Sequence, residues 1–399
     1  MWTGVQSYLM KPAPVRPRDR FLVFGAPQIH DAEIDEVVAT MRSGWLGTGP
    51  RVMRLEKEFA AYKGVEHAAA LNSCTAALHL SILAAGIRPG DEVITTPLTF
   101  CASANAILHA GGTPVLVDVD PDTQNLDPAG LEAAITPRTR AILPVHFAGR
   151  PCAMDSLMEA ARRHGLQVVE DCAHAIESGY HGRPCGTIGD FGCFSFYVTK
   201  NMITVEGGMV LTRDEESIAR IKILGLHGMT KDAWKRYSDE GFKHYAVVEA
   251  GFKYNMTDVQ AAIGIHQLAR VEENWERRRR IWERYQDAFA KLPVGIPAPV
   301  EPDTRHAFHL YTVLIDEERA GVSRDAFLDA MTAHNIGVGV HYLALGEHPY
   351  YRKTLGWSPE DTPHATRIGR QTVSLPLAPN LTDDDVGDVI EAVRRIVGG

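Results

Sequence analysis

Ser195-Phe196-Tyr197-Val198-Thr199-Lys200-Asn201 is the stretch that decides the architecture, because it sets a lysine shortly after a β-rich run. An acidic residue ends an earlier apolar run, Val168-Val169-Glu170-Asp171. A lysine amine can form a Schiff base with a carbonyl group. A lone lysine is usually a solvated surface charge, so the signal comes from its combination with Asp171 and with a third segment, Asn72-Ser73-Cys74-Thr75. Together they predict one site built from distant parts of the chain.

Strands that alternate with helices surround these segments. The β-rich runs lie at residues 93–96, 115–119, 141–145, 168–170, 193–196 and 209–211. Helical patterns are found at residues 102–109, 131–135 and 154–164, and another begins near residue 51. This alternation predicts a buried, mostly parallel sheet. Ligands gather at the carboxyl ends of such strands, where Asp171, Thr99 and Phe100 are expected.

The character of the sequence changes near residue 267. A long charged helix is predicted over residues 271–282, and we interpret its arginines, 277–280, as a solvated face paired with glutamates. A proline-rich segment follows at residues 293–302, and strand-like runs follow at 309–315 and 338–342. The last helix is expected to have Thr382 or Asp383 as its N-cap. These features predict a smaller α+β domain.

The composition excludes several functional classes. The chain has 399 residues, 45% of them apolar and 23% charged, which is ordinary for a soluble protein of two or three domains. The net charge of −9 argues against nucleic acid as the main partner. Residues 1–8 lack the pattern of a signal peptide, and polar residues interrupt the apolar run at 68–83. Neither secretion nor a membrane span is therefore expected.

The use of cysteine and histidine agrees with this interpretation. The cysteines form no C-x-x-C pair, so we expect them to be reduced in the cytoplasm. The 17 histidines show no metal-ligand spacing such as H-E-x-x-H, so no metal site is expected.

A phosphate site is predicted at Asn72-Ser73-Cys74-Thr75, because the segment precedes a helical apolar pattern and N–H groups at a helix start can bind phosphate. An ordinary N-cap is the simpler interpretation of the segment alone. Ser195 could reach the same phosphate from the other side, and Gly207-Gly208 permit a close approach of the backbone.

Asp171 could pair with a protonated ring nitrogen, which is the acidic partner that pyridoxal phosphate uses. His174 could orient that acid or contact a ring hydroxyl. The alternative is an N-cap aspartate beside a hydrogen-bonded histidine. Phe100 could stack on a planar ring, although an aromatic residue after a strand is more often part of the core.

The sequence resembles the DegT/DnrJ/EryC1/StrS family of sugar aminotransferases over nearly the whole chain. The matching blocks are Ser43-Gly44-Trp45-Leu46-Gly47-Thr48-Gly49-Pro50, residues 72–80, Pro89-Gly90-Asp91-Glu92-Val93-Ile94, Thr99-Phe100, residues 169–175, residues 195–201, Glu206-Gly207-Gly208 and Gly251-Phe252-Lys253-Tyr254-Asn255-Met256-Thr257-Asp258. Each block is weak alone, whereas their combination in this order is specific.

This resemblance implies the PLP-dependent transferase fold type I. That fold is α/β, with a mostly parallel central sheet, flanking helices and a smaller C-terminal α+β domain. The large domain, at residues 1–270, would bind pyridoxal 5'-phosphate (PLP). Its N-terminal segment can pack on the small domain, at residues 271–399.

By the same resemblance, Lys200 holds PLP as an internal aldimine and then transfers protons. Asp171 would pair with the ring nitrogen, and His174 would contact the ring hydroxyl. The remaining cofactor contacts that the resemblance implies are Phe100 over one ring face and, at the phosphate, Cys74, Thr75, Ser195 and Asn255.

Two of these positions carry alternatives. Many members of the family have glycine or alanine where this chain has Cys74, and a backbone contact survives that difference if the dihedral angles suit a residue with a Cβ. Asn255 resembles the residue that reaches the partner subunit's phosphate site in a homodimer. It could instead begin a helix at residues 256–268 as its N-cap.

The resemblance implies an aminotransferase that moves an amino group from glutamate or glutamine to a keto group of a nucleotide-activated sugar. The residues that resemble substrate contacts are Trp45, His341, Tyr342 and His348. The alternatives are an aminocyclitol or other keto-substrate transaminase, a PLP-dependent sugar dehydratase and a non-catalytic PLP-binding regulatory protein.

The lysine discriminates among these alternatives. By the same resemblance, the sugar dehydratases of the family have histidine where this chain has Lys200, which argues against that activity here. The combination of Lys200, Asp171 and His174 argues against a regulator. The sugar, the nucleotide, the aminated carbon (C3 or C4), the stereochemistry and the amino donor stay open.

Overall fold

The computed structural model describes residues 18–230 and 245–398. One segment discussed above, residues 1–8, where we expect no signal peptide, lies outside the described residues. Among the described residues, none of the helices combines the length and the apolar character needed to cross a membrane.

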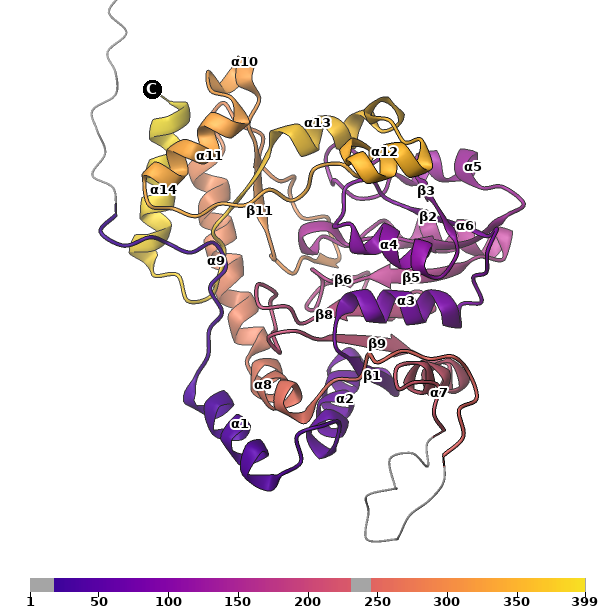
Figure 1. Cartoon of the computed structure of the whole chain (residues 1–399). Helices are drawn as coiled ribbons and strands as arrows, with labels where there is room; N and C mark the ends of the chain where they lie inside the picture. The colour runs from indigo at the N-terminus through magenta and orange to yellow at the C-terminus, as the bar shows by residue number, and fades with distance from the viewer. Residues whose placement is uncertain (1–17, 231–244, 399) are drawn as a thin grey trace, which may run out of the picture.

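A seven-stranded sheet forms the centre of the structure (Figure 1). Its strands, in spatial order, are β1 (His67–Leu71), β9 (Gly208–Thr212), β8 (Phe191–Ser195), β5 (Gln167–Asp171), β4 (Thr139–Leu143), β2 (Glu92–Thr95) and β3 (Thr113–Leu116). All neighbouring pairs are parallel except those of β9, which runs antiparallel to β1 and to β8. The predicted mostly parallel sheet is therefore confirmed.

Helices cover both faces of this sheet because successive strand residues point to opposite sides. Val169 and Cys193 face the helices α3 (Cys74–Ala84), α4 (Ala102–His109) and α7 (Glu215–Leu224). On the other face, Phe194 packs on α2 (Pro50–Lys63) and α8 (Asp258–Ala269), and Val168 packs on α6 (Met154–His164). The strands are thus buried on both sides, which explains their nearly continuous apolar sequences.

Several helix ends follow directly from capping residues. Ser73 is the N-cap of α3, and its hydroxyl accepts a hydrogen bond from the N–H of Ala76 at 3.1 Å. Thr257 caps α8 in a capping box with Gln260, so the alternative interpretation of Asn255 as this N-cap is wrong. Thr382 caps the last helix, α14 (Asp383–Val397), as expected.

The C-terminal part of the chain has its own apolar core. Helix α9 (Val271–Phe289) packs there with α14, α11 (Arg324–Ala333) and a two-stranded antiparallel sheet of β11 (Tyr311–Leu314) and β12 (Thr372–Leu375) (Figure 1). The strand expected at residues 338–342 is wrong, because only a single bridge joins Gly339 to Ser374. The division at residues 270 and 271 stays a prediction.

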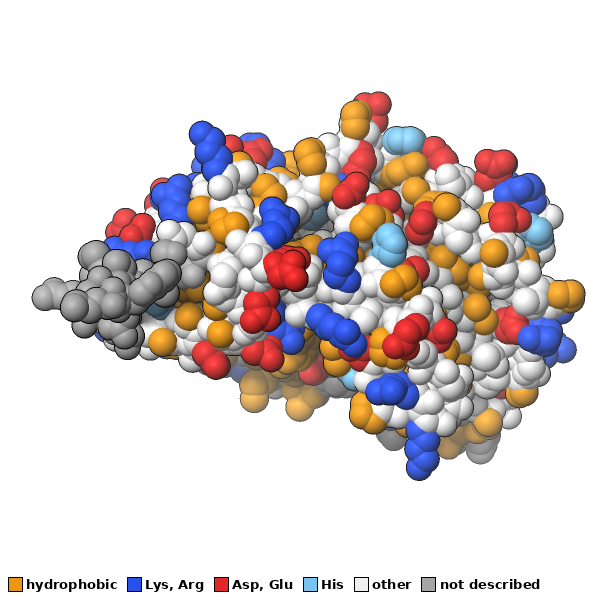
Figure 2. Space-filling model, turned by 90° about the horizontal axis from the view of Figure 1, so that it is seen from above, with side chains coloured by type: hydrophobic (Ala, Val, Ile, Leu, Met, Phe, Trp, Pro, Cys, Tyr) orange, Lys and Arg blue, Asp and Glu red, His pale blue; other side chains and the backbone are white. Residues whose placement is uncertain are grey.

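The remaining elements surround these two cores. They are α1 (Asp31–Ser43), α5 (Leu131–Ala134), α10 (Glu317–Ala320), α12 (Pro349–Leu355), α13 (Pro363–Gln371), and the small sheet of β10 (Thr304–Arg305), β6 (Gly179–Tyr180) and β7 (Arg183–Pro184). The N-terminal residues that are described lie against the C-terminal core, where Leu22 bridges to Ile336 and Arg18 pairs with Asp385. Acidic and basic side chains alternate over the face seen from above (Figure 2).

The arginines of α9 divide into two kinds. Arg279 pairs with Glu276 and Glu283 on the surface, as the interpretation of a solvated face requires. For Arg278 that interpretation is wrong, because its side chain is buried and pairs with buried Glu177 in the segment after β5. A buried ion pair therefore joins α9 to the central sheet.

We predict that Glu177→Ala lowers the free energy of unfolding by about 3 to 5 kcal/mol, because it leaves the buried Arg278 guanidinium without its counter-charge. Urea denaturation followed by circular dichroism measures this loss. Glu283→Ala, which removes an exposed partner of Arg279, is the matched control and should cost less than about 1 kcal/mol. Equal losses in the two variants would contradict the structural role of the buried pair.

Candidate active site

A cavity of about 450 Å³ gathers most of the predicted site residues at the carboxyl ends of β5 and β8. Its wall contains Ser73, Cys74, Thr75, Leu78, Thr99, Phe100, Ala102, Val145, Asp171, Ala173, His174, Ser195, Tyr197, Thr199, Lys200, Glu206, Gly207, His341 and Tyr342. This is the edge where parallel sheets bind ligands. The volume is within the range of small-molecule sites.

Lys200 lies in the turn that follows β8, where its N–H donates to the carbonyl of Tyr197 at 2.9 Å. Burial lowers the pKa of its amine to about 8, because the ammonium form loses hydration inside the protein. The carboxylate of Asp171 opposes this effect by stabilising the ammonium. Because its pKa is lowered on balance, a larger fraction of the amine is uncharged near neutral pH, and the uncharged amine can act as a nucleophile or a base.

Asp171 ends β5 with its carboxylate buried and hydrogen-bonded at both oxygens. Oδ1 accepts from the N–H of Ala173 at 3.1 Å, and Oδ2 accepts from the hydroxyl of Ser103 at 2.9 Å. Burial raises the pKa of Asp171, and these two donors and Lys200 act against that rise. The N-cap interpretation is wrong, because the segment after Asp171 forms a turn and no helix begins there.

Ser103 holds this carboxylate from helix α4 and is itself bonded to Thr99, with 2.8 Å between the two hydroxyl oxygens. The sequence reasoning missed Ser103, although the predicted helix over residues 102–109 puts it one turn after Phe100. It also missed Tyr197, Thr199 and Glu206, which line the cavity within blocks that had been singled out.

His174 is held in one orientation by two hydrogen bonds. Its Nδ1 accepts from the N–H of Ala148 at 3.3 Å, so Nε2 carries the proton and donates to the hydroxyl of Tyr342 at 3.1 Å. Burial lowers the pKa of His174 well below its usual value, and the nearby charge of Lys200 lowers it further. The imidazole ring is therefore neutral, with Nδ1 as its acceptor and Nε2 as its donor.

The start of α3 forms one wall of the cavity. Ser73, Cys74 and Thr75 lie at the N-terminus of this helix, where unpaired N–H groups and the helix dipole favour negative charge. A Cβ on Gly208 would lie 2.5 Å from the carbonyl atoms of Ser73, so only glycine permits β9 to approach this closely. Ser195 lines the cavity from β8, as predicted.

Cys74 can offer backbone groups to a ligand in the cavity, but its thiol is not reactive. Burial raises the pKa of its thiol well above the usual value, so the group stays protonated. The donors at the start of α3, the acid Asp171 and the amine Lys200 border one cavity. They fit the phosphate, the ring nitrogen and the aldehyde of PLP respectively.

Phe100 is 58% exposed and borders the cavity, so the alternative interpretation that it belongs to the core is wrong. Its ring lies 6.1 Å from that of Tyr342, measured between centroids. Tyr342 and His341 also line the cavity, and burial lowers the pKa of His341 to about 4.

Three predicted residues do not line the cavity of this chain. The indole N–H of Trp45 donates to the carbonyl of Thr48 at 3.3 Å, and Asn255 donates from Nδ2 to the hydroxyl of Thr48 at 2.7 Å. His348 is the N-cap of α12. Trp45 is 46% exposed, and it shares the outer surface near α1 with other exposed apolar side chains: Ile34, Val38, Met41, Leu46 and Met53.

Comparison with known proteins gives a consistent picture. Residues 27–394 match the model of the DegT/DnrJ/EryC1/StrS aminotransferase family. The spore coat polysaccharide biosynthesis protein SpsC of Bacillus subtilis (strain 168) is 52% identical over 386 residues, which cover 96% of this chain and 99% of SpsC.

Solved structures agree with the sequence match. The PLP form of Spr1654 from Streptococcus pneumoniae, described as a sugar aminotransferase, superposes with a TM-score of 0.87 at 34% identity, covering 95% of this chain and 99% of that one. DesI, solved in the presence of its TDP-sugar product, superposes with a TM-score of 0.84 at 34% identity, covering 95% of this chain and 94% of that one.

We predict that the Lys200 amine in the cofactor-free protein loses its proton near pH 8. The rate of reductive methylation at Lys200 should rise through that pH, which mass spectrometry of the Lys200 peptide measures. Asp171→Asn should move the midpoint to lower pH, because the carboxylate no longer stabilises the ammonium.

Asp190→Asn is the matched control for this experiment. Its carboxylate accepts from the N–H of Val168 at 2.7 Å, at the end of β5 away from the cavity, so the midpoint should not move. An unchanged midpoint in Asp171→Asn would show that this carboxylate does not act on Lys200.

Proposed function

This chain belongs to the DegT/DnrJ/EryC1/StrS aminotransferase family, and from that premise we propose that it transfers an amino group from glutamate or glutamine to a keto group of a nucleotide-linked sugar. As a member of this family it is a PLP-dependent aminotransferase with the corresponding α/β fold. The donor, the nucleotide-linked acceptor and the roles of single residues are the parts that we propose.

The observation that carries this proposal is the convergence of Lys200, Asp171 and the start of α3 on one cavity. When bound, PLP supplies an electron sink for the substrate α-carbon. Lys200 is proposed to bind the aldehyde of PLP and, once released by the substrate amine, to move a proton through its Nζ atom. Its lowered pKa suits that task, since a proton carrier works best near the operating pH.

Asp171 is proposed to keep the ring nitrogen protonated. A buried carboxylate alone would tend to take up a proton, and the Ala173 N–H and the Ser103 hydroxyl counter that tendency by stabilising the charged form. These two donors support the charged form that would pair with the ring nitrogen. His174, neutral and fixed by Ala148 and Tyr342, is proposed to contact the ring hydroxyl.

The acceptor is proposed to enter on the side of Phe100, His341 and Tyr342. Phe100 is exposed at the cavity and can cover one ring face. The relatives supply the class of acceptor: SpsC is described as a polysaccharide biosynthesis protein, and DesI was solved with its TDP-sugar product. We place the enzyme in the cytoplasm, where free cysteines such as Cys74 and Cys193 stay reduced.

An aminocyclitol or other keto-substrate transaminase is the second candidate, because the same cofactor residues would serve it. A panel experiment separates the two. The PLP-loaded enzyme is incubated with glutamate and with nucleotide-linked keto-sugars differing in nucleotide and in keto position, and the products are weighed by mass spectrometry. We expect an amino sugar from at least one member of the panel and none with Lys200→Ala.

Borohydride reduction before peptide mapping reports on the same proposal. It should fix the cofactor to Lys200, whereas Lys57→Ala, which changes an exposed residue of α2, should behave as the wild type. Label on another lysine would remove the basis of the proposed roles.

Amination of a free aminocyclitol ketone, with no reaction across the sugar panel, would favour the second candidate.

A homodimer with shared sites is proposed as the working unit. Asn255 does not line the cavity of its own chain, and it hydrogen-bonds to Thr48 in the loop that carries exposed Trp45. The exposed apolar side chains near α1 form the kind of surface that marks a protein interface. A two-fold pair would let this surface serve both subunits and bring each Asn255 to the other phosphate site.

We predict that two inactive variants restore activity when their subunits exchange. In a heterodimer of Lys200→Ala with Asn255→Ala, one shared site carries both lesions and the other carries neither, so about half of the sites per heterodimer should work. Activity after mixing, together with native mass spectrometry of the heterodimer, measures this. Absence of recovery with heterodimers present, and with Asn255→Ala inactive alone, would mean that each subunit builds its site by itself.

A further inference from the structure

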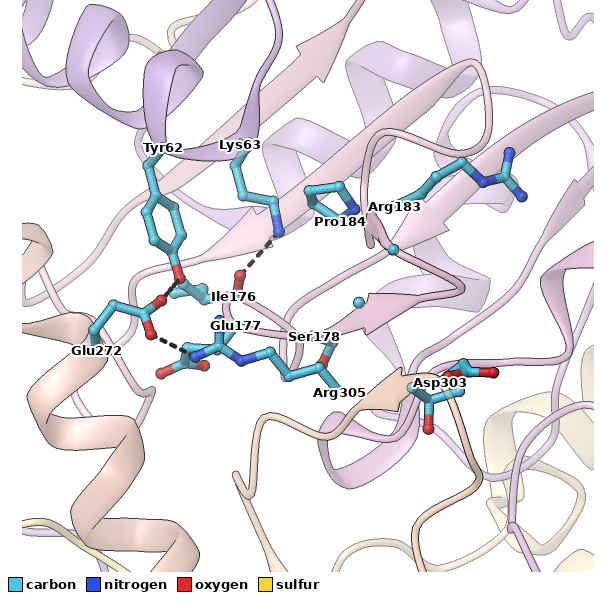
Figure 3. Close-up of a pocket in the computed structure, with 13 residues that line it drawn as sticks. Tyr62, Lys63, Ile176, Glu177, Ser178, Arg183, Pro184, Glu272, Asp303 and Arg305 are labelled. Carbon is cyan, nitrogen blue, oxygen red and sulfur yellow. Dashed lines mark hydrogen bonds and ion pairs between the residues drawn. The ribbon is translucent and has the colours of Figure 1, made fainter.

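A second cavity, of about 480 Å³, lies where the end of α2 meets the β6–β7 hairpin, β10 and the first turn of α9 (Figure 3). Among the described residues, no side chain lines both this cavity and the one that contains Lys200. Tyr62, Ile176 and Pro184 give it an apolar part. Its cationic residues are Lys63, Arg305 and Arg183, and Arg183 pairs with Asp155 outside the cavity.

Lys63 is the unusual residue of this cavity. It is the last residue of α2 and only 2% exposed. Its Nζ donates to the carbonyl of Ile176 at 2.9 Å (Figure 3). The same atom lies 4.9 Å from the centre of the Phe194 ring. Within residues 18–230 and 245–398 no carboxylate forms an ion pair with it, although an ammonium group this deeply buried normally requires one.

Two of the three carboxylates in the wall are already engaged elsewhere. Glu272 accepts from the Tyr62 hydroxyl at 2.7 Å through Oε1 and pairs with Arg305 at 2.5 Å through Oε2. Glu177 pairs with Arg278 through Oε1 and accepts from Asn201 at 2.8 Å through Oε2. Asp303 lies at the end of the cavity away from Lys63 (Figure 3). None of these acids is free to neutralise Lys63.

Lys63 therefore has donor capacity to spare in this cavity. Burial lowers the pKa of Lys63, and Glu170 and Glu177 offset this only in part, so the site favours a ligand that brings its own negative charge. The Nε atom of Arg305 is buried and has no hydrogen-bond partner.

We propose that this cavity binds a small organic anion with one carboxylate and a short apolar body. The carboxylate would accept from Lys63 Nζ and lie near the positive charge of Arg305, and the body would lie against Tyr62, Ile176 and Pro184. A single negative charge matches Lys63, the deeply buried cation of this cavity, which has no ion-pair partner among the described residues. A doubly charged phosphate would bring excess negative charge close to Glu272 and Glu177.

Calorimetric titration of the PLP-loaded enzyme with benzoate tests this proposal. The wild type should bind benzoate, and Lys63→Met should weaken that binding at least about tenfold, because a charge-assisted hydrogen bond is lost. Lys57→Met removes an exposed lysine from the same helix and should bind as the wild type does. Methionine keeps the apolar stem of Lys63, and thermal unfolding verifies that the variant is folded.

Arg305→Gln supplies a second test that does not depend on Lys63→Met folding, and it should also weaken benzoate binding. Equal affinity in the wild type, Lys63→Met and Arg305→Gln would place benzoate elsewhere and overturn the proposal. Absence of binding to the wild type at millimolar benzoate would overturn it as well. Inorganic phosphate that binds more tightly than benzoate, with the same dependence on Lys63, would overturn the carboxylate class.

Discussion

The enclosure of a lysine amine beside a carboxylate, at the carboxyl edge of a parallel sheet, is the constraint on which the site depends. Burial alone would neutralise both groups, since each loses hydration in its charged form. The pKa of Lys200 is lowered to about 8, and that of Asp171 is raised. Ser103 and the Ala173 N–H oppose the rise at the acid by stabilising its charged form, whereas burial at Lys200 favours the neutral amine. The start of α4, through Ser103, and the turn after β5, through the Ala173 N–H, supply the hydrogen bonds that separate the behaviour of the acid from that of the amine.

Much of the fold and of this site could be predicted from the sequence, because the information is local. Strands buried on both faces are continuous apolar runs, and Asp171 is the last residue of β5. Ser73 and Thr382 cap helices through contacts within a few residues, and the helix over residues 154–164 was predicted with its exact ends. The resemblance to a family supplied the order in which these local signals meet.

The failures came from contacts between distant segments. The charged helix α9 gave no sign that Arg278, unlike Arg279, turns inward to Glu177, because all four arginines stand in one run. Residues 338–342 have the composition of a strand, yet they line the cavity with His341 and Tyr342 and pair only at Gly339. Ser103 looked like any polar residue at the start of a helix. Tertiary packing, which a single sequence does not display, decided each case.

The antiparallel direction of β9 limits where the chain can accept insertions or deletions. Strands β8 and β9 are antiparallel neighbours, so the segment between them forms a closed loop with both ends anchored in adjacent strands. Backbone hydrogen bonds from Phe196 to Gly207 and from Thr204 to Phe196 tie the two sides together, and Lys200 lies at the tip. An insertion here would displace the amine itself, whereas an insertion in a crossover between parallel strands can be accommodated at the surface. Length variation among related chains is therefore expected to avoid residues 196–207.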